Sequence, residues 1–429
     1  MVQPVSPLSI AAFRNYWFAR FFSTIALNGM VVIIGWQVYD VARRTMAPRE
    51  AAVYLGLIGV AQFLPLLLLT LVTGLAADRL DRRWIARGTT ALELLCAATL
   101  ALLTWGDRET LPALFAVASL LGVARAFAAP ALQALSPNLV PKEMLPSAIA
   151  FSSFAWQVGA IAGPPIGGYL YAIDPPLAYA ASAALLMTSL LLLLAIGPVP
   201  RSAVDRRGNP WSQALEGFAY VRRNRLVLGA ISLDLFAVLL GGATAMLPIY
   251  ARDILHSGSE GLGHLRAAPA VGAALVAFWL GRRPLRTAIG VKLLIAVGVF
   301  GLGTILFGLS HHSPAPMATA LGCLGLLGAA DMVSVYVRQS LIQLYTPDEM
   351  RGRVGAASTL FISGSNELGE AESGFLAAAI GPVAAVVAGG VGTIIIAILW
   401  ARLFPEILRA RSFDPPKSFE EIPAQEKPA

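Results

Sequence analysis

The chain has 429 residues, of which 57% are apolar and only 13% are charged. A soluble domain carries about 25% charged residues, and its interior is too small to bury this much apolar surface. Composition therefore excludes a soluble enzyme, a soluble nucleic-acid-binding protein and a disordered chain, and it predicts a multi-pass membrane protein. The apolar content is enough for about twelve membrane helices of about 20 residues each.

Apolar runs separated by Gly, Pro or charged residues mark the predicted spans in chain order. The first twenty residues contain Arg14 and Arg20 before any long apolar run, so they lack the form of a secretory signal peptide. Twelve spans are predicted, near residues 17–42, 52–77, 84–106, 111–136, 146–173, 176–197, 226–252, 262–281, 288–310, 316–344, 354–381 and 383–404.

The one long internal polar stretch follows the sixth run and divides the spans into six plus six. From Trp211 to Leu228 it has the pattern of an amphipathic helix on the membrane surface, although a solvated linker fits equally well. The residues near the C-terminus are rich in Pro and charge, which is typical of a disordered tail. The predicted parts are an N-terminal six-helix bundle (1–197), a cytoplasmic linker (198–225), a C-terminal six-helix bundle (226–405) and a disordered cytoplasmic tail (406–429).

Lys and Arg are unevenly divided between the two sets of alternate loops, seventeen against five. Because cytoplasmic loops carry the excess of Lys and Arg, the richer set is predicted to be cytoplasmic, together with both termini. The expected location is a cell inner or plasma membrane. The net charge of +7 then serves topology and contact with anionic lipid headgroups and does not indicate a nucleic-acid partner.

Shifting the chain over itself by 206 residues reveals an internal repeat without gaps. GVARAFAAPALQALSPNLVPKEM (122–144) aligns with GAADMVSVYVRQSLIQLYTPDEM (328–350), and the loop pattern P-x-E-M occurs in both. Two halves in the same orientation, each of six spans, are the plan of parallel-repeat transporters. A substrate is then expected near the membrane midplane, between the halves.

Several motifs add a resemblance to a known family. The loop GLAADRLDRR (74–83), the glycine pattern GAIAGPPIGG (159–168) and Arg125 in the fourth span resemble motifs of the major facilitator superfamily. The layout, including SNELGEAESG (365–374), is similar to its enterobactin-exporter and macrolide-efflux branch. The resemblance covers roughly residues 10–405 and departs from the family pattern at Asp81, where Gly is usual.

The resemblance implies an all-α integral membrane fold of twelve transmembrane helices in two six-helix bundles, the major facilitator fold. It also implies a conformational latch at Gly74, Asp78, Arg79, Arg82 and Arg83, and a pivot motif at Gly159, Gly163, Pro164, Gly167 and Gly168. We expect Asp78 to cap the eleventh span; a plain basic turn is the alternative. Glycines at i, i+4 and i+8 also allow close helix packing without any pivot role.

Ionisable residues inside spans are the next candidates, since each costs several kcal/mol unless it is paired or faces a water-filled cavity. Arg125 and Asp331 occupy equivalent repeat positions, and Asp331 has Arg338 as an alternative local partner. The candidates for proton coupling or cavity charge are Arg125, Glu93, Asp234, Asp331, Glu367, Glu370 and Glu372. Glu367 and Glu370 share a helix face, so their like charges favour one neutral carboxyl group; a polar helix packed against Arg is the alternative.

Polar and aromatic residues of the first and fifth spans are possible substrate contacts. They are Asn28, Gln37, Trp36 and Trp156. For any single aromatic residue, a position facing lipid or in the interfacial belt is the competing interpretation.

The sequence lacks a nucleotide-binding P-loop, a G-x-S-x-G elbow and a cluster of Cys and His with metal-ligand spacing. We therefore predict no enzymatic activity, no metal and no cofactor, with the proton gradient as the driving force. The predicted function is proton-coupled efflux (antiport) of a lipophilic or siderophore-like small molecule by alternating access. A proton-coupled importer (symporter) and a non-transporting receptor with the same fold are the alternatives. The expected partners are a small-molecule substrate and membrane lipid, and the expected state is a monomer.

Overall fold

The apolar runs form helices in the computed structural model, which describes residues 6–79, 81–141, 144–198, 210–283, 285–347 and 350–413, some by backbone alone. The described part contains helices and turns and no strand. Its long helices are α1 (Ala11–Arg43), α2 (Pro48–Arg79), α3 (Arg82–Trp105), α4 (Leu111–Leu135), α5 (Leu145–Ile173), α6 (Pro175–Leu194), α8 (Arg225–Leu240), α10 (Gly258–Arg282), α11 (Ile289–Gly308), α12 (Pro316–Leu344), α13 (Arg351–Ile380) and α14 (Pro382–Leu403).

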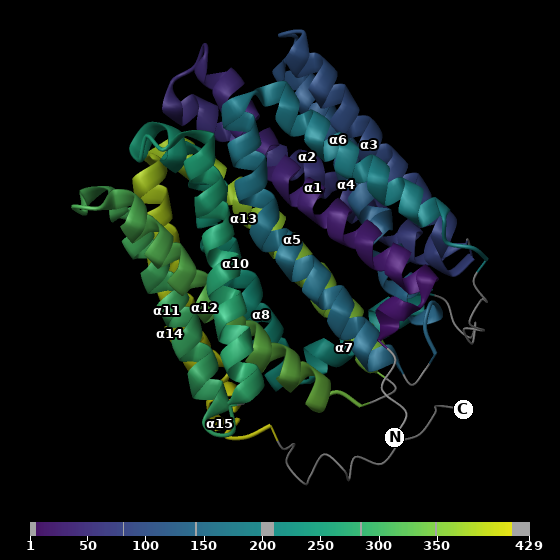
Figure 1. Cartoon of the computed structure of the whole chain (residues 1–429). Helices are drawn as coiled ribbons and strands as arrows, with labels where there is room; N and C mark the ends of the chain where they lie inside the picture. The colour runs from purple at the N-terminus through teal and green to yellow at the C-terminus, as the bar shows by residue number, and fades with distance from the viewer. Residues whose placement is uncertain are drawn as a thin grey trace.

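The helices form two groups with the same internal pairing. In the first half, α1 packs on α5 and α6, α2 on α4, and α3 on α4 and α6; in the second half, α8 packs on α13 and α14, α10 on α12, and α11 on α12 and α14. Figure 1 shows the two groups, with α5 at the boundary between them. The pairing corresponds helix for helix, so the two halves are parallel structural repeats.

The glycine shared by the repeat has the same role in both halves. A Cβ at Gly122 of α4 would overlap the backbone carbonyl oxygen of Gln62 in α2, and a Cβ at Gly328 of α12 would overlap that of Pro269 in α10. Only glycine lets the two backbones approach this closely. The sequence repeat is therefore also a repeat of helix contacts.

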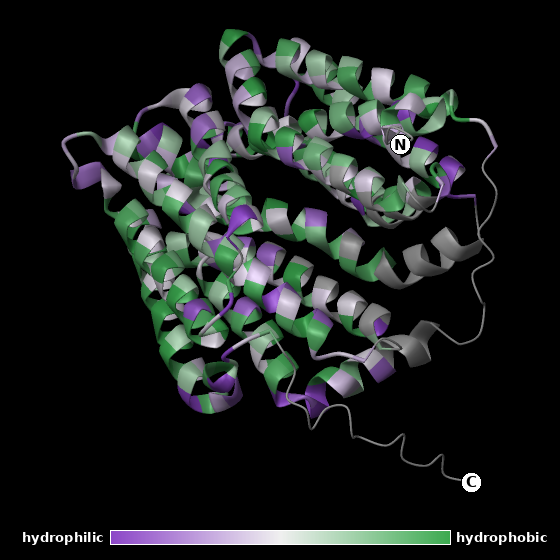
Figure 2. Ribbon diagram, turned by 60° about the horizontal axis from the view of Figure 1, so that its bottom comes forward, coloured by the Kyte–Doolittle hydropathy of each residue, from purple (hydrophilic) through white to green (hydrophobic). Residues whose placement is uncertain are grey.

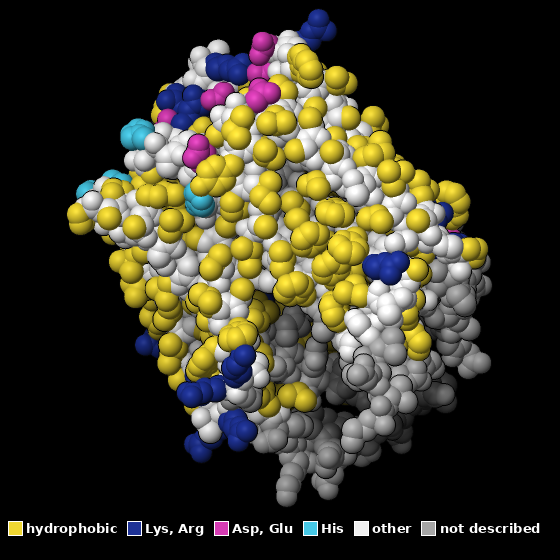
Figure 3. All heavy atoms as spheres, in the orientation of Figure 1, with side chains coloured by type: hydrophobic (Ala, Val, Ile, Leu, Met, Phe, Trp, Pro, Cys, Tyr) yellow, Lys and Arg dark blue, Asp and Glu magenta, His cyan; other side chains and the backbone are white. Residues whose placement is uncertain are grey.

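Length and surface chemistry show that the protein spans a membrane. Within the described residues, ten segments are long and apolar enough to cross, and α5 and α13 add helices of 29 and 30 residues. Figure 2 shows apolar residues along most of the helices, and in Figure 3 most charged side chains lie toward the top and bottom of the face shown, with apolar side chains over most of its middle. The predicted all-α membrane fold with twelve spans is confirmed.

A local sequence signal explains where α3 begins. Asp81 caps α3: its side chain accepts a hydrogen bond from the backbone N–H of Arg83 at 3.0 Å and forms an ion pair with the Arg83 guanidinium at 2.6 Å. A capping carboxylate stabilises the exposed N–H groups of a helix start. This gives a structural reason for Asp at the position where the resemblance expects Gly.

The seventh predicted span is interrupted. α8 ends before Gly241 and Gly242, and the chain continues through η4 (Ala243–Met246), α9 (Leu247–Ile249) and η5 (Tyr250–Ile254), the last a π-helical turn. Glycine has low helix propensity, which favours the end of α8 at Gly241 and Gly242. Gly369 on α13 leaves room for the carbonyl oxygens at this break. A Cβ at Gly369 would lie 2.8 Å from the carbonyl oxygen of Val238.

The linker contains a helix, α7 (Pro210–Arg223), that packs on the second half. Glu216 of α7 pairs with Arg353 of α13, and the Tyr220 hydroxyl donates a hydrogen bond to the backbone carbonyl of Tyr345 at 2.8 Å. These contacts tie α7 to α13 and to Tyr345, the residue after α12, and α7 also packs on the adjoining α8. The predicted helix therefore forms and is attached to the second half. Its position at the membrane surface stays a prediction.

Part of the predicted tail is ordered. After α14 the chain forms α15 (Pro405–Arg409), whose Ile407 is fully buried, and the Ala410 carbonyl accepts a hydrogen bond from the Gly290 N–H at 3.0 Å. Buried apolar surface thus extends the second half beyond the predicted boundary. Residues 414–429 lie outside the described part.

Replacement of Gly328 by Ala should destabilise the second half, because its Cβ would overlap the Pro269 carbonyl. Overpacking of this kind costs about 1–3 kcal/mol. Gly322→Ala on the same helix is the control, since a Cβ there meets open space and alanine raises helix propensity by up to about 1 kcal/mol. Thermal unfolding of the purified variants should give a lower Tm for Gly328→Ala alone; equal Tm values would contradict the close contact.

Candidate functional site

The two halves contact each other through α5 with α10 and α2 with α13. We call the membrane face at which α1 ends and α2 begins the first-loop face, and the opposite face, which carries α7, the linker face. A candidate functional site in such a fold lies where the halves meet, so these contacts are described first.

α5 contacts α1 and α10 through two different faces. Its predicted glycine stripe packs on α1 within the first half: Cβ atoms at Gly159, Gly163 and Gly167 would lie 2.6–2.8 Å from atoms of Thr24, Ile25 and Gly29. The stripe therefore builds the first half, as the packing interpretation expected. A pivot role for these glycines stays a prediction.

Gly168 and Pro164 face the second half. A Cβ at Gly168 would overlap the backbone carbonyl of Ser259 in α10, and a Cβ at Gly263 would lie 2.8 Å from the Pro164 carbonyl. One residue of separation turns a helix by about 100°, which is why Gly167 and Gly168 contact different halves. A similar approach joins Gly56 of α2 to Gly374 of α13.

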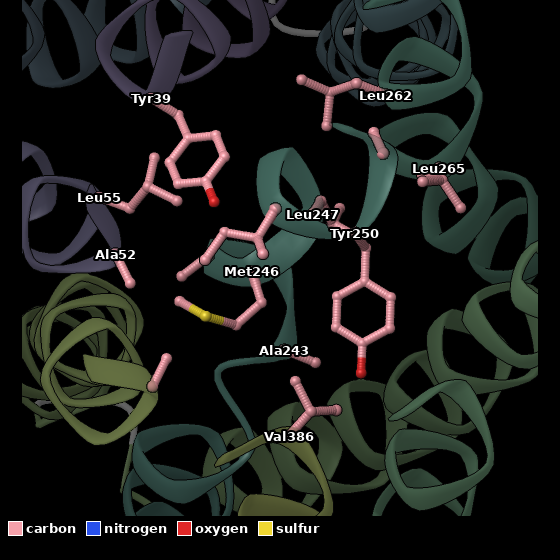
Figure 4. Packing of buried hydrophobic residues seen from close by; sticks show 14 of the residues in the cluster. Tyr39, Ala52, Leu55, Ala243, Met246, Leu247, Tyr250, Leu262, Leu265 and Val386 are labelled. Atoms are coloured by element: carbon pink, nitrogen blue, oxygen red, sulfur yellow. The ribbon is translucent and has the colours of Figure 1, made fainter. Parts of the chain in front are cut away.

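An apolar cluster seals the halves together near the first-loop face. Figure 4 shows Tyr39, Ala52 and Leu55 of the first half packed against the broken seventh span and α10 of the second half. The second-half members in this view include Met246, Leu247, Tyr250, Leu262 and Leu265. Because the cluster draws side chains from both halves, separation of the halves at this face would expose it.

Two ion pairs add a polar part to this seal. Asp40 of α1 pairs with Arg252 of η5, and Arg43 pairs with Asp253 at 3.4 Å. The Tyr39 hydroxyl also donates a hydrogen bond to the Asp253 carboxylate. All four charged side chains are partly exposed to solvent, so each pair contributes modest stability. Contacts of this strength allow the face to open.

A small pocket lies between the halves beside the seal. Its apolar walls come from α1, α2, α9 and α10, and its polar side chains are Gln62, Thr244, Arg266 and Glu370. The pocket thus receives residues from both repeats and from the break in the seventh span. It is the candidate substrate site.

Arg266 and Glu370 place opposite charges in this pocket. Nη2 of Arg266 lies 3.5 Å from Oε1 of Glu370, and each side chain is about a quarter exposed, 24% and 27%. Nη1 of Arg266 donates a hydrogen bond to the Thr244 carbonyl at 2.9 Å. This contact with a guanidinium of another helix agrees with the alternative in the sequence analysis, a polar helix packed against Arg. The Glu367 side chain lies outside the described residues.

Arg125 lies close to the same pocket from the first half. Its Nη1 donates to Oε1 of Gln62, a pocket residue, at 3.4 Å. Glu93, which interacts electrostatically with Arg125, is only 2% exposed, and its Oε1 has no hydrogen-bond partner among the described residues. Arg125 thus lies on the first-half side of the pocket, whereas Glu93 is buried within the same half.

Asp234 and Asp331 lie elsewhere, inside the second half. Asp234 pairs with Arg338, and both side chains are almost fully buried, at 6% and 3% exposed. Arg338, expected as a local partner of Asp331, instead contacts Asp234 of α8 and Ser334. Asp234, Asp331 and Ser334 line a smaller cavity. Glu372 also lies apart from the central pocket and hydrogen-bonds with Ser373.

The predicted substrate contacts are scattered. Gln37 is 1% exposed; its amide donates to Thr104 at 3.1 Å and accepts from the Tyr179 hydroxyl at 2.6 Å, so it is a packing residue of the first half. Asn28 donates to the Thr24 carbonyl, Trp36 packs beside the apolar seal, and Trp156 is half exposed. None of the four lines the central pocket.

The latch residues are described only in part. The side chains of Gly74, Asp78 and Arg79 lie outside the described residues. Arg82 begins α3, and Arg83 forms the ion pair with the capping Asp81. The expected contact of Asp78 with the eleventh span therefore stays a prediction.

Sequence reasoning missed Arg266 and the ion-paired residues of the seal. A signal for Arg266 was present, because an arginine within the run 262–281 is costly unless it is paired or hydrated. No comparable signal identified Arg252 and Asp253, which lie at the end of a span where charge is ordinary. Their role in the seal follows only from the structure, in which they pair with Asp40 and Arg43 of α1.

Comparisons with known proteins agree with this architecture. A family model described as transmembrane secretion effector matches residues 2–426. Enterobactin exporters of Escherichia coli O1:K1 / APEC and Shigella boydii serotype 18 are each 29% identical, over 410 and 409 residues, covering 94% of this chain and 94% of the relative.

Solved structures share the fold. One is a bacterial homologue of the human lysosomal transporter Spinster, inward-facing and unoccupied (TM-score 0.70, 16% identity, 93% of this chain and 96% of that chain). Another is the inward-open xylose transporter XylE of Escherichia coli (TM-score 0.70, 15% identity, 97% and 99%).

Reversal of one charge in the seal should open the first-loop face. Arg252→Asp would face Asp40 with a like charge, and Asp40→Arg in the same chain should recover part of the closure. Spin labels at Arg108→Cys and His312→Cys, with Cys96 and Cys323 replaced by Ala, would report the distance between the halves.

The single reversal should add a population at longer distance, and the double reversal should reduce it. Arg225→Asp is the control, since Arg225 pairs with Glu406 within the second half at 2.8 Å. An unchanged distance in Arg252→Asp would show that the ion pairs do not contribute to closure.

Proposed function

Because the chain belongs to the transmembrane secretion effector family of the major facilitator superfamily, we propose that it exports a lipophilic or siderophore-like small molecule by proton-coupled antiport. Family membership makes it a membrane transporter and not an enzyme. The observation that carries the proposal is the pocket between the two repeats, in which Arg266 and Glu370 lie beside a closed first-loop face. The relatives named as enterobactin exporters support efflux.

The proposed orientation follows the distribution of Lys and Arg. The linker face, which carries α7 and the basic loops, is cytoplasmic, and so are both termini. The first-loop face is then the outer face of an inner or plasma membrane. With the outer face sealed, the pocket is loaded from the cytoplasmic side, as export requires. We propose a monomer surrounded by lipid, without a nucleic-acid partner.

Alternating access fits the difference between contacts within the halves and contacts across them. Within a half, glycine-mediated backbone packing joins α1 to α5 and α10 to α12. Across the halves, glycines also bring α5 close to α10 and α2 close to α13, but the seal at the first-loop face includes partly exposed ion pairs, which exchange readily for water. Each half therefore moves as a unit while the seal opens and closes, and the pocket residues face one side at a time.

Glu370 is the proposed proton carrier. Its carboxylate lies in the pocket, where it is accessible to water and substrate, whereas Asp234 is already paired with Arg338 and Glu93 is almost completely buried. Protonation of Glu370 removes its charge, and with it the attraction to Arg266. Proton and substrate then use the same group in alternation, which is the requirement for antiport.

Glu370→Gln should abolish proton coupling while leaving the protein folded. The variant, the parent and Glu260→Gln, which changes an exposed carboxylate in the first turn of α10, are reconstituted in proteoliposomes with an imposed pH gradient and an internal pH dye. Lipophilic cations, macrolides and catecholate siderophores are added in turn.

In the parent and in Glu260→Gln, a transported compound should dissipate the gradient by moving opposite to the protons, and in Glu370→Gln it should not. Unchanged coupling in Glu370→Gln would transfer the proton site to Glu93 or Asp234. Proton movement in the same direction as the compound would favour the symporter.

Asp78→Asn tests the proposed latch at Gly74, Asp78, Arg79, Arg82 and Arg83. Loss of the charge should lower the transport rate without lowering the amount of protein in the membrane, because a latch affects conformational exchange and not folding. Transport in the same proteoliposomes, normalised to protein, measures this. A full transport rate would exclude Asp78 from the latch.

A further inference from the structure

We infer that Asp331, Asp234 and Ser334 form a binding site for a small monovalent metal cation such as Na⁺ inside the second half. The three side chains line a small cavity between α8 and α12, and α11 lines the rest of it. The cavity is separate from the central pocket, so this inference does not rest on the proposed function. The bound ion would balance a charge that the protein leaves unbalanced.

The charges at the cavity do not cancel. Arg338 forms an ion pair with Asp234, and both side chains are almost fully buried. Asp331 has neither an ion pair nor a hydrogen bond with any described residue. Two carboxylates and one guanidinium leave a net charge of −1 near the middle of α12. A charge at that depth in the membrane is costly unless a counter-charge is bound.

A second observation indicates a small ligand at this place. Nε of Arg338 is buried and has no hydrogen-bond partner among the described residues, in a side chain that is 3% exposed. Buried donors without a partner are rare in proteins and indicate a water molecule or ion that completes the site. A cation that binds with a water ligand brings an oxygen acceptor for this N–H group.

The positions on α12 place the three polar residues of this helix together. Asp331, Ser334 and Arg338 are spaced at i, i+3 and i+7, so they share one face of the helix. The ion pair with Asp234 shows that this face is directed toward α8. Nη1 of Arg338 also donates to the Ser334 hydroxyl at 3.5 Å. The guanidinium is thereby held at one end of the face, and Asp331 is left at the other end.

Every polar side chain in the wall of the cavity supplies an oxygen ligand. These are the carboxylates of Asp234 and Asp331 and the hydroxyl of Ser334. Oxygen ligands suit hard cations such as Na⁺. The small size of the cavity and its apolar walls exclude a large organic cation. The apolar residues of the wall are Ala237, Val238, Val297 and Phe300.

The net charge favours a monovalent ion over a divalent one. One positive charge neutralises the cavity, whereas a divalent ion would leave an excess positive charge beside Arg338. Within the described residues, no group of three or more His, Cys, Asp or Glu side chains could hold a metal ion, so the ligand set of a tight divalent site is missing there. The absence of a metal was predicted from Cys and His spacing, which does not report oxygen ligands.

Thermal unfolding of the purified protein in NaCl and in choline chloride of equal ionic strength tests the site. Choline is too large for the cavity, and the chloride concentration stays constant. An ion that binds only the folded state raises the Tm. At a Na⁺ concentration several times the dissociation constant, the Tm of the parent should be roughly 2–4 °C higher in NaCl. Equilibrium dialysis with radioactive sodium measures the binding directly.

Asp331→Asn should remove both the shift in Tm and the bound sodium, because it removes the unbalanced charge. Ser334→Ala removes one neutral ligand and should raise the Na⁺ concentration needed for half of the shift by about tenfold or more. This second variant tests the site even if Asp331→Asn fails to fold. Glu93→Gln changes a buried carboxyl group of the first half and is the matched control, which should keep the shift.

Equal Tm values of the parent in the two salts, or no bound sodium, would overturn the inference, and a proton on Asp331 would then balance the charge. A shift that persists in Asp331→Asn would overturn it as well, because the ion would bind elsewhere. A larger shift in CaCl₂ than in NaCl would refute a monovalent site. The assay needs neither a transported compound nor a gradient, so its result is independent of the proposed antiport.

Discussion

Close approach of helix backbones at glycine is the constraint on which the other features of this structure depend. In α5, Gly159, Gly163 and Gly167 lie against α1, while Gly168 lies against α10 of the other half. Side chains of any size would separate these helices, because a Cβ has no space at the contacts. The same helix therefore packs closely on both halves, on α1 through one face and on α10 through another.

The break in the seventh span also depends on close helix packing at a glycine, Gly369 of α13. A membrane helix can be interrupted only where protein groups satisfy the freed backbone, and here Arg266 of α10 does so. Arg266 occupies the Thr244 carbonyl beside Pro248, and Gly369 leaves room for the carbonyls at the end of α8. Discontinuous helices are a recurring way to build transport sites at the midplane. In this protein the break delivers Thr244, Ala245 and Pro248 to the pocket.

The charged pairs differ in burial, and their burial separates their roles. Asp234 and Arg338 are sealed inside the second half, where breaking the pair would leave a buried charge at a cost of several kcal/mol. Arg266 and Glu370 are partly accessible in the pocket. The pairs between Asp40 and Arg252 and between Arg43 and Asp253, at the seal, are exposed to a similar degree. The pair of Asp234 and Arg338, with a structural role, is thus the most deeply buried. The pairs proposed to change partners during transport lie where water reaches them.

The sequence by itself determined the membrane class, the twelve spans, the parallel repeat and the shared face of the α5 glycines, because composition and periodicity report what each helix can bury. Several of the residues it proposed for the site, including Arg125, Glu93 and Glu370, do lie in or near the pocket, since ionisable groups inside spans are costly enough to stand out. Only the tertiary structure decided which partner each group meets. Gln37 accepts a hydrogen bond from Tyr179 inside the first half. Arg338 forms an ion pair with Asp234 and none with Asp331 within the described residues, and Arg266 is the partner of Glu370. Periodicity defines the face of a helix on which a residue lies, but the helix opposite that face comes from a distant part of the chain, and its identity depends on how all twelve spans pack.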